Sequence, residues 1–432
     1  MMIRNILKSG SARNAGWLIG GQVLDKLLNF LIGILTARYL GSENYGLLHY
    51  GTAYTVLFGN LCRLGLQSVI IKDFADHPEE EGEALGTALV LRSICALLSA
   101  VTIVGFASIM DRDDPITVLV VALSSLDLLF MSLDSFKQWF QSRLESKFVA
   151  MAMTVSYLAV TAYRVILMLT GRDVVLFALS NAVHYLVVAI WLMIAYKKRG
   201  GQRLRFSRKK AKQLLSASGS FIISGVMVSI CASTDKLMLK QLMDEAAVGY
   251  YSLAYQLSST WIFVLQAIID SVHPLIIQAH GKDHAGYLRK NRQLYALVFY
   301  VAAAVCLVLS LVAKPAITIL YGQEYLGAVV PLRIVVWYTA FAYLSSARDA
   351  WIICEHQQKY LKYLYFSAAV INVVLNYALI PVLGPSGAAL ASLLTQASTV
   401  VVLPLLIKPL RPNARLMLDA VLLRDVLPKK YE

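Results

Sequence analysis

Charged residues are scarce in this 432-residue chain: Lys, Arg, Asp and Glu together make up 15% of it, whereas 58% of the residues are apolar. An ordinary globular domain contains about a quarter charged residues. So few charges cannot cover a water-exposed surface, which excludes a soluble protein. Membrane-spanning helices need about 20 apolar residues each. We therefore expect an all-α polytopic membrane protein.

Cysteine is also rare, and the five cysteines lie singly in apolar runs without a CxxC spacing. This pattern excludes a disulfide framework and a cysteine metal site, so we interpret the cysteines as packing residues. A cleaved signal peptide is not expected, because the polar and basic start leads into a full-length apolar stretch.

Enzyme motifs are missing as well. The chain has no Walker motif and no HExxH, so neither ATP hydrolysis nor a metal or other cofactor is expected. No outward loop exceeds about eight residues, which leaves little room for an extramembrane catalytic site. We predict a transporter rather than an enzyme.

Long apolar stretches dominate what is present, and each can cross a bilayer as a helix. They run approximately over 16–38, 46–71, 85–110, 116–136, 148–170, 174–196, 213–242, 250–279, 293–320, 329–354, 363–383 and 387–408. The sequence therefore predicts twelve spans.

The distribution of Lys and Arg predicts the orientation. With the N-terminus inside, 28 of the 40 basic residues fall in cytoplasmic segments, and only Arg112 and Arg172 fall in outward loops. Cytoplasmic loops of membrane proteins carry such an excess. Both termini are therefore predicted to be cytoplasmic. The net charge of +14 reflects topology, so no nucleic-acid partner is expected.

A basic loop, KKRGGQRLRFSRKKAK at 197–212, separates six predicted spans from the next six. We expect an N-terminal lobe at 1–212, a C-terminal lobe at 213–408 and a cytoplasmic tail at 409–432. The loop is either an orientation anchor that attracts anionic lipid headgroups or a protein-docking site. The acidic run DHPEEEGEA at 76–84 is interpreted as a solvated connector.

Weak internal similarity supports the two halves. Asp25-Lys26 in the first span recurs as Asp235-Lys236 in the seventh. Six spans per half would make parallel repeats related by an axis along the membrane normal, which places a substrate cleft between them.

Several basic residues lie too deep in the spans to reach the interface. Each costs about 3 kcal/mol at a lipid-facing mid-bilayer position. The six deep cations are Lys26, Arg63, Arg92, Arg164, Lys236 and Arg348. Two interpretations stay open: every deep cation is ion-paired inside the bundle, or several line a water-filled cleft that binds an anionic ligand.

Acidic residues in the spans are candidates for ion coupling, because a carboxylate in a cleft can titrate. The candidates are Asp25, Asp127, Asp134 and Asp235. Asp127 and Asp134 could instead pair with Arg63 or Arg92. Asn372 and Asn376, an i,i+4 pair, are expected to form interhelical hydrogen bonds rather than ligand contacts.

Four segments carry a family resemblance: ARYLGSENYGLLHY from Ala37, TDKLMLKQLMDEAAVGYYSLAYQL from Thr234, YGQEY from Tyr321 and INVVLNYALIPVLGPSGAALAS from Ile371. Together they resemble the bacterial polysaccharide-repeat flippases, the O-antigen and exopolysaccharide translocases of the multidrug/oligosaccharidyl-lipid/polysaccharide exporter superfamily. The resemblance runs from about Arg13 to Leu406, and the Asn-x-x-x-Asn helix followed by Pro, Gly and Gly-Ala-Ala is its most specific motif.

The resemblance implies a V-shaped fold of twelve helices in two lobes around a central cleft, in a bacterial cytoplasmic membrane. It implies transport of an undecaprenyl-pyrophosphate-linked oligosaccharide from the cytoplasmic to the periplasmic leaflet by alternating access. The helices that line the cationic cavity of the family would carry Lys26, Arg63 and Lys236 here. The assignment of Arg92, Arg164 and Arg348 to the cleft depends only on their charge and their depth in the spans.

Two other functions remain open. A multidrug exporter of the same superfamily would expel organic cations, for which a cationic cleft is a poor host. A lipid-processing membrane enzyme would need a polar cluster, but Asp270, His273 and His280 are spread out and lack a partner motif. The sequence also leaves open which glycan is carried, and whether the chain acts alone or docks with a polysaccharide polymerase and a chain-length regulator.

Overall fold

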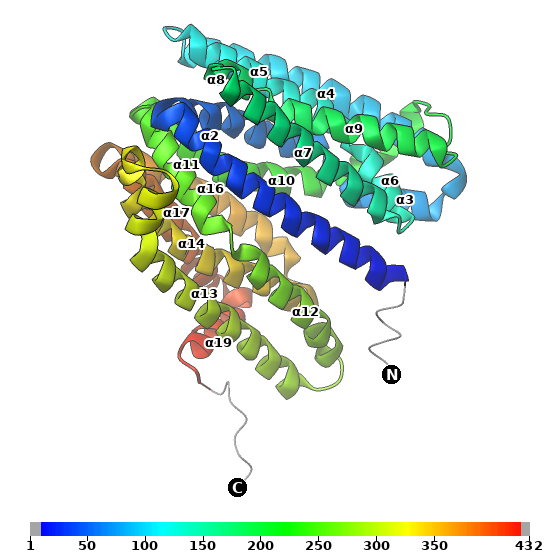
Figure 1. Cartoon of the computed structure of the whole chain (residues 1–432). Helices are drawn as coiled ribbons and strands as arrows, with labels where there is room; N and C mark the ends of the chain where they lie inside the picture. Colours follow the sequence, from blue (N-terminus) through cyan, green and yellow to red (C-terminus); the bar gives the residue numbers. More distant parts are fainter. Residues whose placement is uncertain (1–9, 425–432) are drawn as a thin grey trace. The chain divides into compact units, whose positions relative to one another are not determined.

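The computed structural model describes residues 10–424, with side chains from 26 onward except those of 27, 220 and 224. This part of the chain is helical and has no β-strand (Figure 1). It contains 11 helices long and apolar enough to cross a membrane. The predicted all-α polytopic membrane fold is thereby confirmed.

The chain divides into two compact units, residues 1–233 and 234–432. The longer helices of the first unit are α2 (Gly10–Arg63), α3 (Leu66–Asp76), α4 (Glu81–Met110), α5 (Pro115–Met131), α6 (Ser135–Ser142), α7 (Ser146–Leu169), α9 (Ser180–Lys198) and the first part of α10 (Arg208–Leu242). Short turns η1 (Pro78–Glu80), η2 (Ser132–Asp134) and α8 (Val174–Phe177) join them.

The second unit continues from α10. Its longer helices are α11 (Glu245–Ser259), α12 (Ile262–His280), α13 (His284–Leu320), α14 (Val329–Ala347), α16 (Leu361–Leu383), α17 (Pro385–Ala397) and α19 (Arg411–Val421). Shorter turns are η3 (Gln323–Ala328), α15 (Asp349–Cys354), η4 (Gln358–Tyr360), the π-helical turn η5 (Ser398–Val402), α18 (Leu403–Leu406) and η6 (Lys408–Leu410).

A kink explains why twelve predicted spans become 11 candidate helices. The first candidate, Leu28–Asp76, carries both of the first two predicted spans. The predicted loop between them is helical except at Gly41, whose φ of 73° and ψ of 174° lie in a region open essentially to glycine. The chain therefore turns sharply within α2 instead of through a loop.

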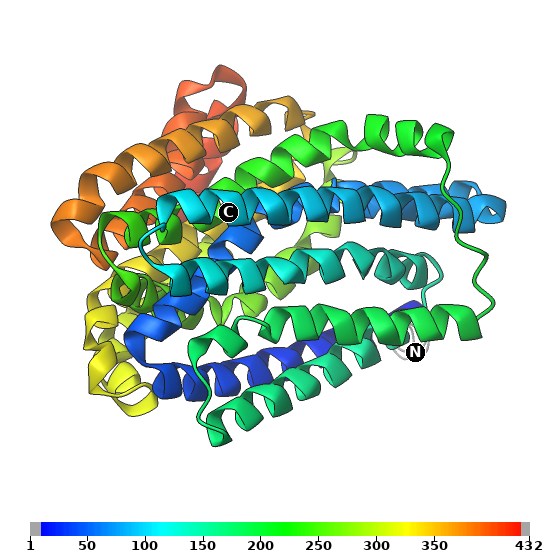
Figure 2. The ribbon, with the colours of Figure 1, turned by 90° about the horizontal axis from the view of Figure 1, so that it is seen from above.

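The helices of the first unit pack around a small apolar core. Figures 1 and 2 show α4, α5, α7 and α9 running alongside one another. At one end of this bundle the buried side chains of α3, α4, α6 and α9 meet, with Trp139, Phe140 and Leu192 fully buried. α2 packs against both α5 and α7, which places its inward face in the middle of the unit.

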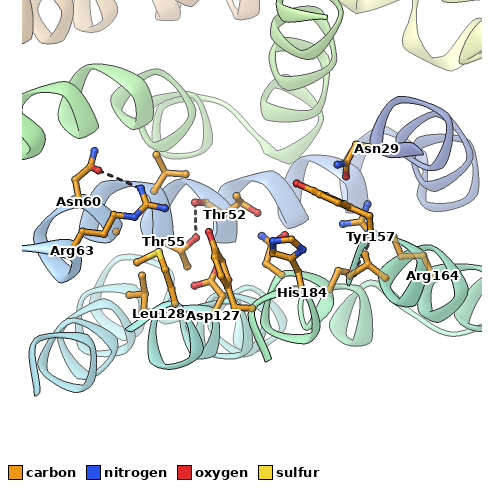
Figure 3. A pocket seen from close by; sticks show the side chains of 17 residues that line it. Asn29, Thr52, Thr55, Asn60, Arg63, Asp127, Leu128, Tyr157, Arg164 and His184 are labelled. Carbon is orange, nitrogen blue, oxygen red and sulfur yellow. Dashed lines mark hydrogen bonds between the residues drawn. The ribbon is translucent and has the colours of Figure 1, made fainter. Parts of the chain in front are cut away.

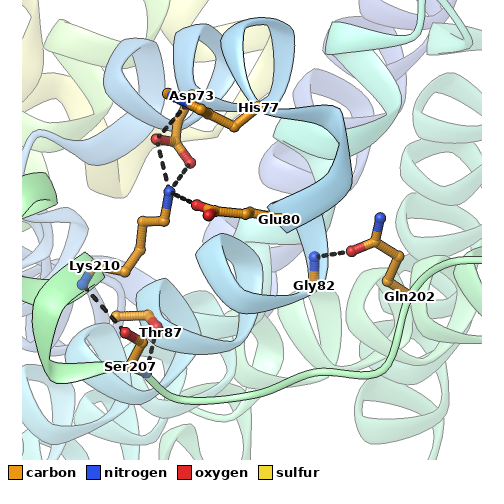
Figure 4. Close-up of polar contacts among 8 residues, drawn as sticks. All are labelled: Asp73, His77, Glu80, Gly82, Thr87, Gln202, Ser207 and Lys210. Carbon is orange, nitrogen blue, oxygen red and sulfur yellow. Dashed lines mark hydrogen bonds and ion pairs between the residues drawn. The ribbon is translucent and has the colours of Figure 1, made fainter.

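The basic loop after α9 is hydrogen-bonded to the start of α4 (Figure 4). Gly82 N donates to Gln202 Oε1 at 2.9 Å, and Ser207 N donates to Thr87 Oγ1 at 3.0 Å. A Cβ on Gly82 would lie 2.5 Å from the carbonyl oxygen of Arg203, so the close approach requires glycine. These contacts hold the loop against α4 within the first compact unit, which extends to Ser233.

The acidic run at 76–84 is exposed over residues 76–80, as predicted for a solvated connector, but Glu81, Gly82 and Ala84 are buried. Glu81 is buried and accepts hydrogen bonds from Trp139 Nε1 at 2.9 Å and Arg143 Nη2 at 2.7 Å. Lys210 lies 2.6 Å from Glu80 Oε2 and 3.3 Å from Asp73 Oδ1. Burial alone would lower the pKa of Lys210, but these carboxylates raise it above its ordinary value.

The C-terminal segment, predicted as a cytoplasmic tail, folds back as α19 against α13 (Figure 1). Asn413 Nδ2 donates to Tyr295 Oη at 2.7 Å, and Tyr300 Oη donates to the carbonyl of Val421 at 2.7 Å. Only one narrow face of α19 is apolar, so the segment was too polar overall to be predicted as a packed helix. Residues after Arg424 lie outside the described part.

Candidate functional site

A polar cavity of about 300 Å³ lies inside the first unit, among the spanning helices α2, α5, α7 and α9 (Figure 3). Most of its lining side chains carry hydrogen-bonding groups. The polar lining residues are Asn29, Thr52, Thr55, Asn60, Arg63, Asp127, Tyr157, Arg164, Ser180, Asn181, His184 and Tyr185. Such a group of side chains in membrane-spanning helices is typical of a ligand or ion pathway.

Helical periodicity and the kink together bring these side chains to one place. Thr52, Thr55 and Arg63 are spaced along one face of α2, as Tyr157 and Arg164 are on α7. A straight helix with a rise of about 1.5 Å per residue would separate Asn29 from Arg63 by about 50 Å. The turn at Gly41 lets both line the same cavity.

Arg63 and Arg164 are the two cations of the cavity. In Figure 3 they lie at opposite ends of the labelled side chains, with Asp127 and His184 between them. Arg63 Nη1 lies 3.5 Å from Asn60 Oδ1, and its Nε is buried without a hydrogen-bond partner. Arg164 Nε donates to Ser180 Oγ at 3.1 Å. Within the described residues neither guanidinium lies within 4 Å of a carboxylate.

Asp127 contributes the only carboxylate among the described lining residues. Its side chain is 5% exposed, and Oδ1 has no hydrogen-bond partner in the part of the chain described. A buried carboxylate oxygen without a donor is costly. Asp127 therefore has bonding capacity left for a proton, an ion or a ligand.

Sequence reasoning missed the uncharged part of the cavity. The rings of Tyr157 and His184 are 4.8 Å apart, and those of His184 and Tyr185 are 5.1 Å apart. A search for charged residues in apolar spans does not select Tyr, Asn or a neutral His. Their signal was the run of Ser180, Asn181, His184 and Tyr185 along one side of an otherwise apolar span.

Arg92 and Asp134 lie in the same unit but outside the cavity lining. Arg92 is 1% exposed and donates to Ser135 Oγ at 2.7 Å and to the carbonyl of Met131 at 3.2 Å. Asp134 Oδ1 lies 2.6 Å from Lys137 Nζ. Lys26 is exposed, and the side chain of Asp25 lies outside the described residues.

The remaining predicted cations belong to the second unit. Lys236 is half-buried, with Nζ 5.9 Å from the centre of the Tyr255 ring. Arg348 is 2% exposed and donates to Ser345 Oγ at 3.0 Å and to the carbonyl of Thr399 at 3.2 Å. Thr399 belongs to the π-helical turn η5.

Asp235 is the centre of a hydrogen-bonded cluster. Its Oδ1 accepts from Asn372 at 3.0 Å and from Asn376 at 2.7 Å, and its Oδ2 accepts from Tyr251 and Ser392. These donors come from α16, α11 and α17. The interhelical hydrogen bonding predicted for Asn372 and Asn376 is confirmed, and their shared partner is a carboxylate.

Comparisons with known proteins agree with the expected fold and class. A family model described as polysaccharide biosynthesis protein matches residues 11–280. The chain is 21% identical to the lipid II flippase MurJ of Bacillus subtilis (strain 168), with 87% of this chain and 78% of the relative covered.

Two solved structures show the fold. A lipid II flippase MurJ in an inward closed conformation has a TM-score of 0.71 at 14% identity, covering 95% of this chain and 91% of that one. An inward-facing multidrug resistance MATE family transporter of the MOP superfamily has a TM-score of 0.66 at 14% identity, covering 90% and 95%. These proteins are a flippase and a transporter, not enzymes.

Proposed function

The chain belongs to the polysaccharide biosynthesis protein family, and from this premise we propose that it is a flippase for a lipid-linked oligosaccharide. Its substrate would be an undecaprenyl-pyrophosphate-linked repeat unit, moved by alternating access from the cytoplasmic to the periplasmic leaflet of a bacterial inner membrane. The MurJ relative, named as a lipid II flippase, supports a lipid-linked substrate.

The observation that carries this proposal is the presence of Arg63 and Arg164 in one polar cavity, neither of them ion-paired within the described residues. A diphosphate cannot cross hydrocarbon alone, because the loss of its hydration shell is prohibitive. A guanidinium at either end of the cavity can supply charge-assisted hydrogen bonds that replace part of that shell. The neutral amides and hydroxyls beside them suit the sugars attached to such a headgroup.

Ion coupling is part of the same proposal, and the contacts rank the candidate carboxylates. Asp134 forms an ion pair with Lys137. Each side-chain oxygen of Asp235 accepts hydrogen bonds from two donors. Asp127, with an oxygen that lacks a donor and a place in the cavity wall, is the carboxylate we propose to carry a proton or sodium ion. Polymerase and chain-length regulator would act on the glycan after it is flipped.

Transport by the purified chain in liposomes tests the function. The probe is a fluorescent undecaprenyl-diphosphate disaccharide, and its transfer is read from quenching by an impermeant reductant. We expect Arg63→Gln and Arg164→Gln each to slow transfer at least about tenfold, because each removes one charge-assisted contact. The matched control is Arg333→Gln in α14, where the exposed side chain donates to the carbonyl of Ser310 at 3.1 Å.

Equal transfer by wild type, Arg63→Gln and Arg164→Gln would overturn the proposal. Uptake of an organic cation by the same liposomes, with no transfer of the lipid-linked probe, would assign the chain to drug export instead.

A further inference from the structure

We propose that His184 is the residue that recognises the sugar, by accepting a hydrogen bond at Nε2 from a hydroxyl or N–H group next to the diphosphate, and that Ser156 positions it for this role. The inference rests on the proposed function. In that function Arg63 and Arg164 bind the diphosphate, and the inference assigns a residue to the sugar. Three features of the cavity carry it.

The first feature is a double contact between Ser156 and His184. Ser156 Oγ lies 2.7 Å from His184 Nδ1 and 2.9 Å from the backbone carbonyl oxygen of the same residue. The serine hydroxyl is fully buried on α7, and His184 lies on α9. Two contacts from one hydroxyl hold the imidazole ring against α7.

The double contact fixes the tautomer of the ring. A serine hydroxyl has one proton, and a carbonyl oxygen can only accept. The proton of Ser156 therefore goes to the carbonyl of His184, so Oγ must accept from Nδ1–H. In a neutral imidazole with Nδ1 protonated, Nε2 carries the free lone pair.

The second feature is the direction of that lone pair. His184 lines the cavity whereas Ser156 does not. Because Nδ1 faces Ser156 on the side away from the cavity, Nε2 on the opposite edge of the ring faces inward. The ring is flanked by Tyr157 and Tyr185, at 4.8 and 5.1 Å between ring centres, which restricts its rotation.

The third feature is the mismatch between this acceptor and a phosphate. An ionised diphosphate presents only acceptor oxygens, which the donors of Arg63 and Arg164 match. Nε2 of a neutral histidine cannot bond to such an oxygen and needs a donor. A ligand that satisfies both parts of the cavity must carry anionic oxygens and hydroxyl or N–H donors together, as a glycosyl diphosphate does and a lipid diphosphate does not. Tyr157 offers a ring face for the apolar side of the sugar.

Binding of two ligands that differ by one sugar tests the assignment. The full-length chain in nanodiscs is titrated with undecaprenyl diphosphate and with undecaprenyl diphosphate N-acetylglucosamine. His184→Phe keeps a ring but removes the acceptor. We expect it to weaken binding of the sugar-bearing ligand about tenfold and to leave undecaprenyl diphosphate unchanged, because a donor on the bound sugar loses its partner. His184→Gln, whose amide oxygen restores an acceptor, should recover most of the loss.

Two further variants separate this inference from the proposed function. Ser156→Ala frees the ring and should weaken only the sugar-bearing ligand, by about threefold. Arg63→Gln should weaken both ligands equally. Equal effects of His184→Phe on the two ligands, or no effect on either, would overturn the role of His184. An Arg63→Gln variant that binds both ligands normally would overturn the cationic site and leave the His184 result standing. If His184→Phe does not fold, Ser156→Ala decides: unchanged binding of the sugar-bearing ligand by this variant, or equal weakening of both ligands, would overturn the role of His184.

Discussion

Asp235 and Asp127 are both carboxylates buried in membrane-spanning helices, but they differ in their hydrogen bonding. Asp235 in the second unit accepts from four side chains on three other helices. Asp127 in the first unit has an oxygen with no partner among the described residues and faces a cavity. Burial of a charge alone therefore does not identify a binding site. What distinguishes Asp127 is a partnerless oxygen together with a place in a cavity wall.

The cations show the same contrast. Arg92 and Arg348 donate to serine hydroxyls and backbone carbonyls, and each is almost fully buried. Nε of Arg63, like Nε of Arg92 and Arg348, has no hydrogen-bond partner in the described part of the chain, but only Arg63 and Arg164 are among the lining residues of the cavity. We infer that the first pair holds helices together, whereas the second pair is available to a ligand.

Alanine substitution of the two aspartates gives the strongest test of the difference between Asp235 and Asp127. Asp235→Ala leaves four buried donors without their acceptor, and we expect it to lower the free energy of unfolding by about 4 kcal/mol. Asp127→Ala should change it by less than about 1 kcal/mol, because few bonds are lost. Unfolding of the purified proteins by dodecyl sulfate, followed by circular dichroism, measures both. Equal losses of stability would show that the hydrogen-bond pattern does not separate the two residues.

Substitution of Gly41 by alanine tests whether the cavity depends on the kink in α2. Alanine is strained at φ 73°, ψ 174°, so Gly41→Ala should lower the free energy of unfolding by about 2 kcal/mol. It should also weaken binding of the diphosphate ligands, because Asn29 and Arg63 would no longer line the same cavity. Gly105→Ala in α4 is the control, since a Cβ there meets no atom within 4 Å. A Gly41→Ala protein with normal stability and binding would mean that the turn is not needed.

Lys210 gives the smallest expected effect. It bridges Asp73 and Glu80, and Lys210→Met should cost about 1 kcal/mol at neutral pH. Because these carboxylates raise the pKa of Lys210 above its ordinary value, its contribution is complete below about pH 10 and is lost as pH rises through the folded pKa. Unfolding of wild type and Lys210→Met at pH 7 and pH 11 checks this sign. A difference that grows at pH 11 would contradict it.

The fold could be predicted from the sequence because spanning helices depend on local apolar length. Each of the twelve stretches is mainly helical, and ten of them lie on one or two helices. The turn at Gly41 and the docking of α19 were not predicted, since one depends on a single backbone conformation and the other on a narrow apolar face.

The candidate site was predictable only in part. Arg63, Arg92, Arg164 and Arg348 give the same signal in sequence, a cation within an apolar span. Their different environments depend on acceptors from distant helices, such as the carbonyls of Met131 and Thr399. His184 and Tyr157 gave no charge signal, so their place in the cavity became visible only in the folded unit.

The π-helical turn at Ser398–Val402 has a consequence for chain length. Such a turn holds one residue more than the regular helix, which changes the carbonyl pairing locally. Deleting one residue there would restore regular winding, remove the acceptor presented to Arg348, and rotate everything downstream by about 100°. Insertions or deletions in this stretch would therefore leave a buried guanidinium without an acceptor, although Arg348 is not among the lining residues of the cavity.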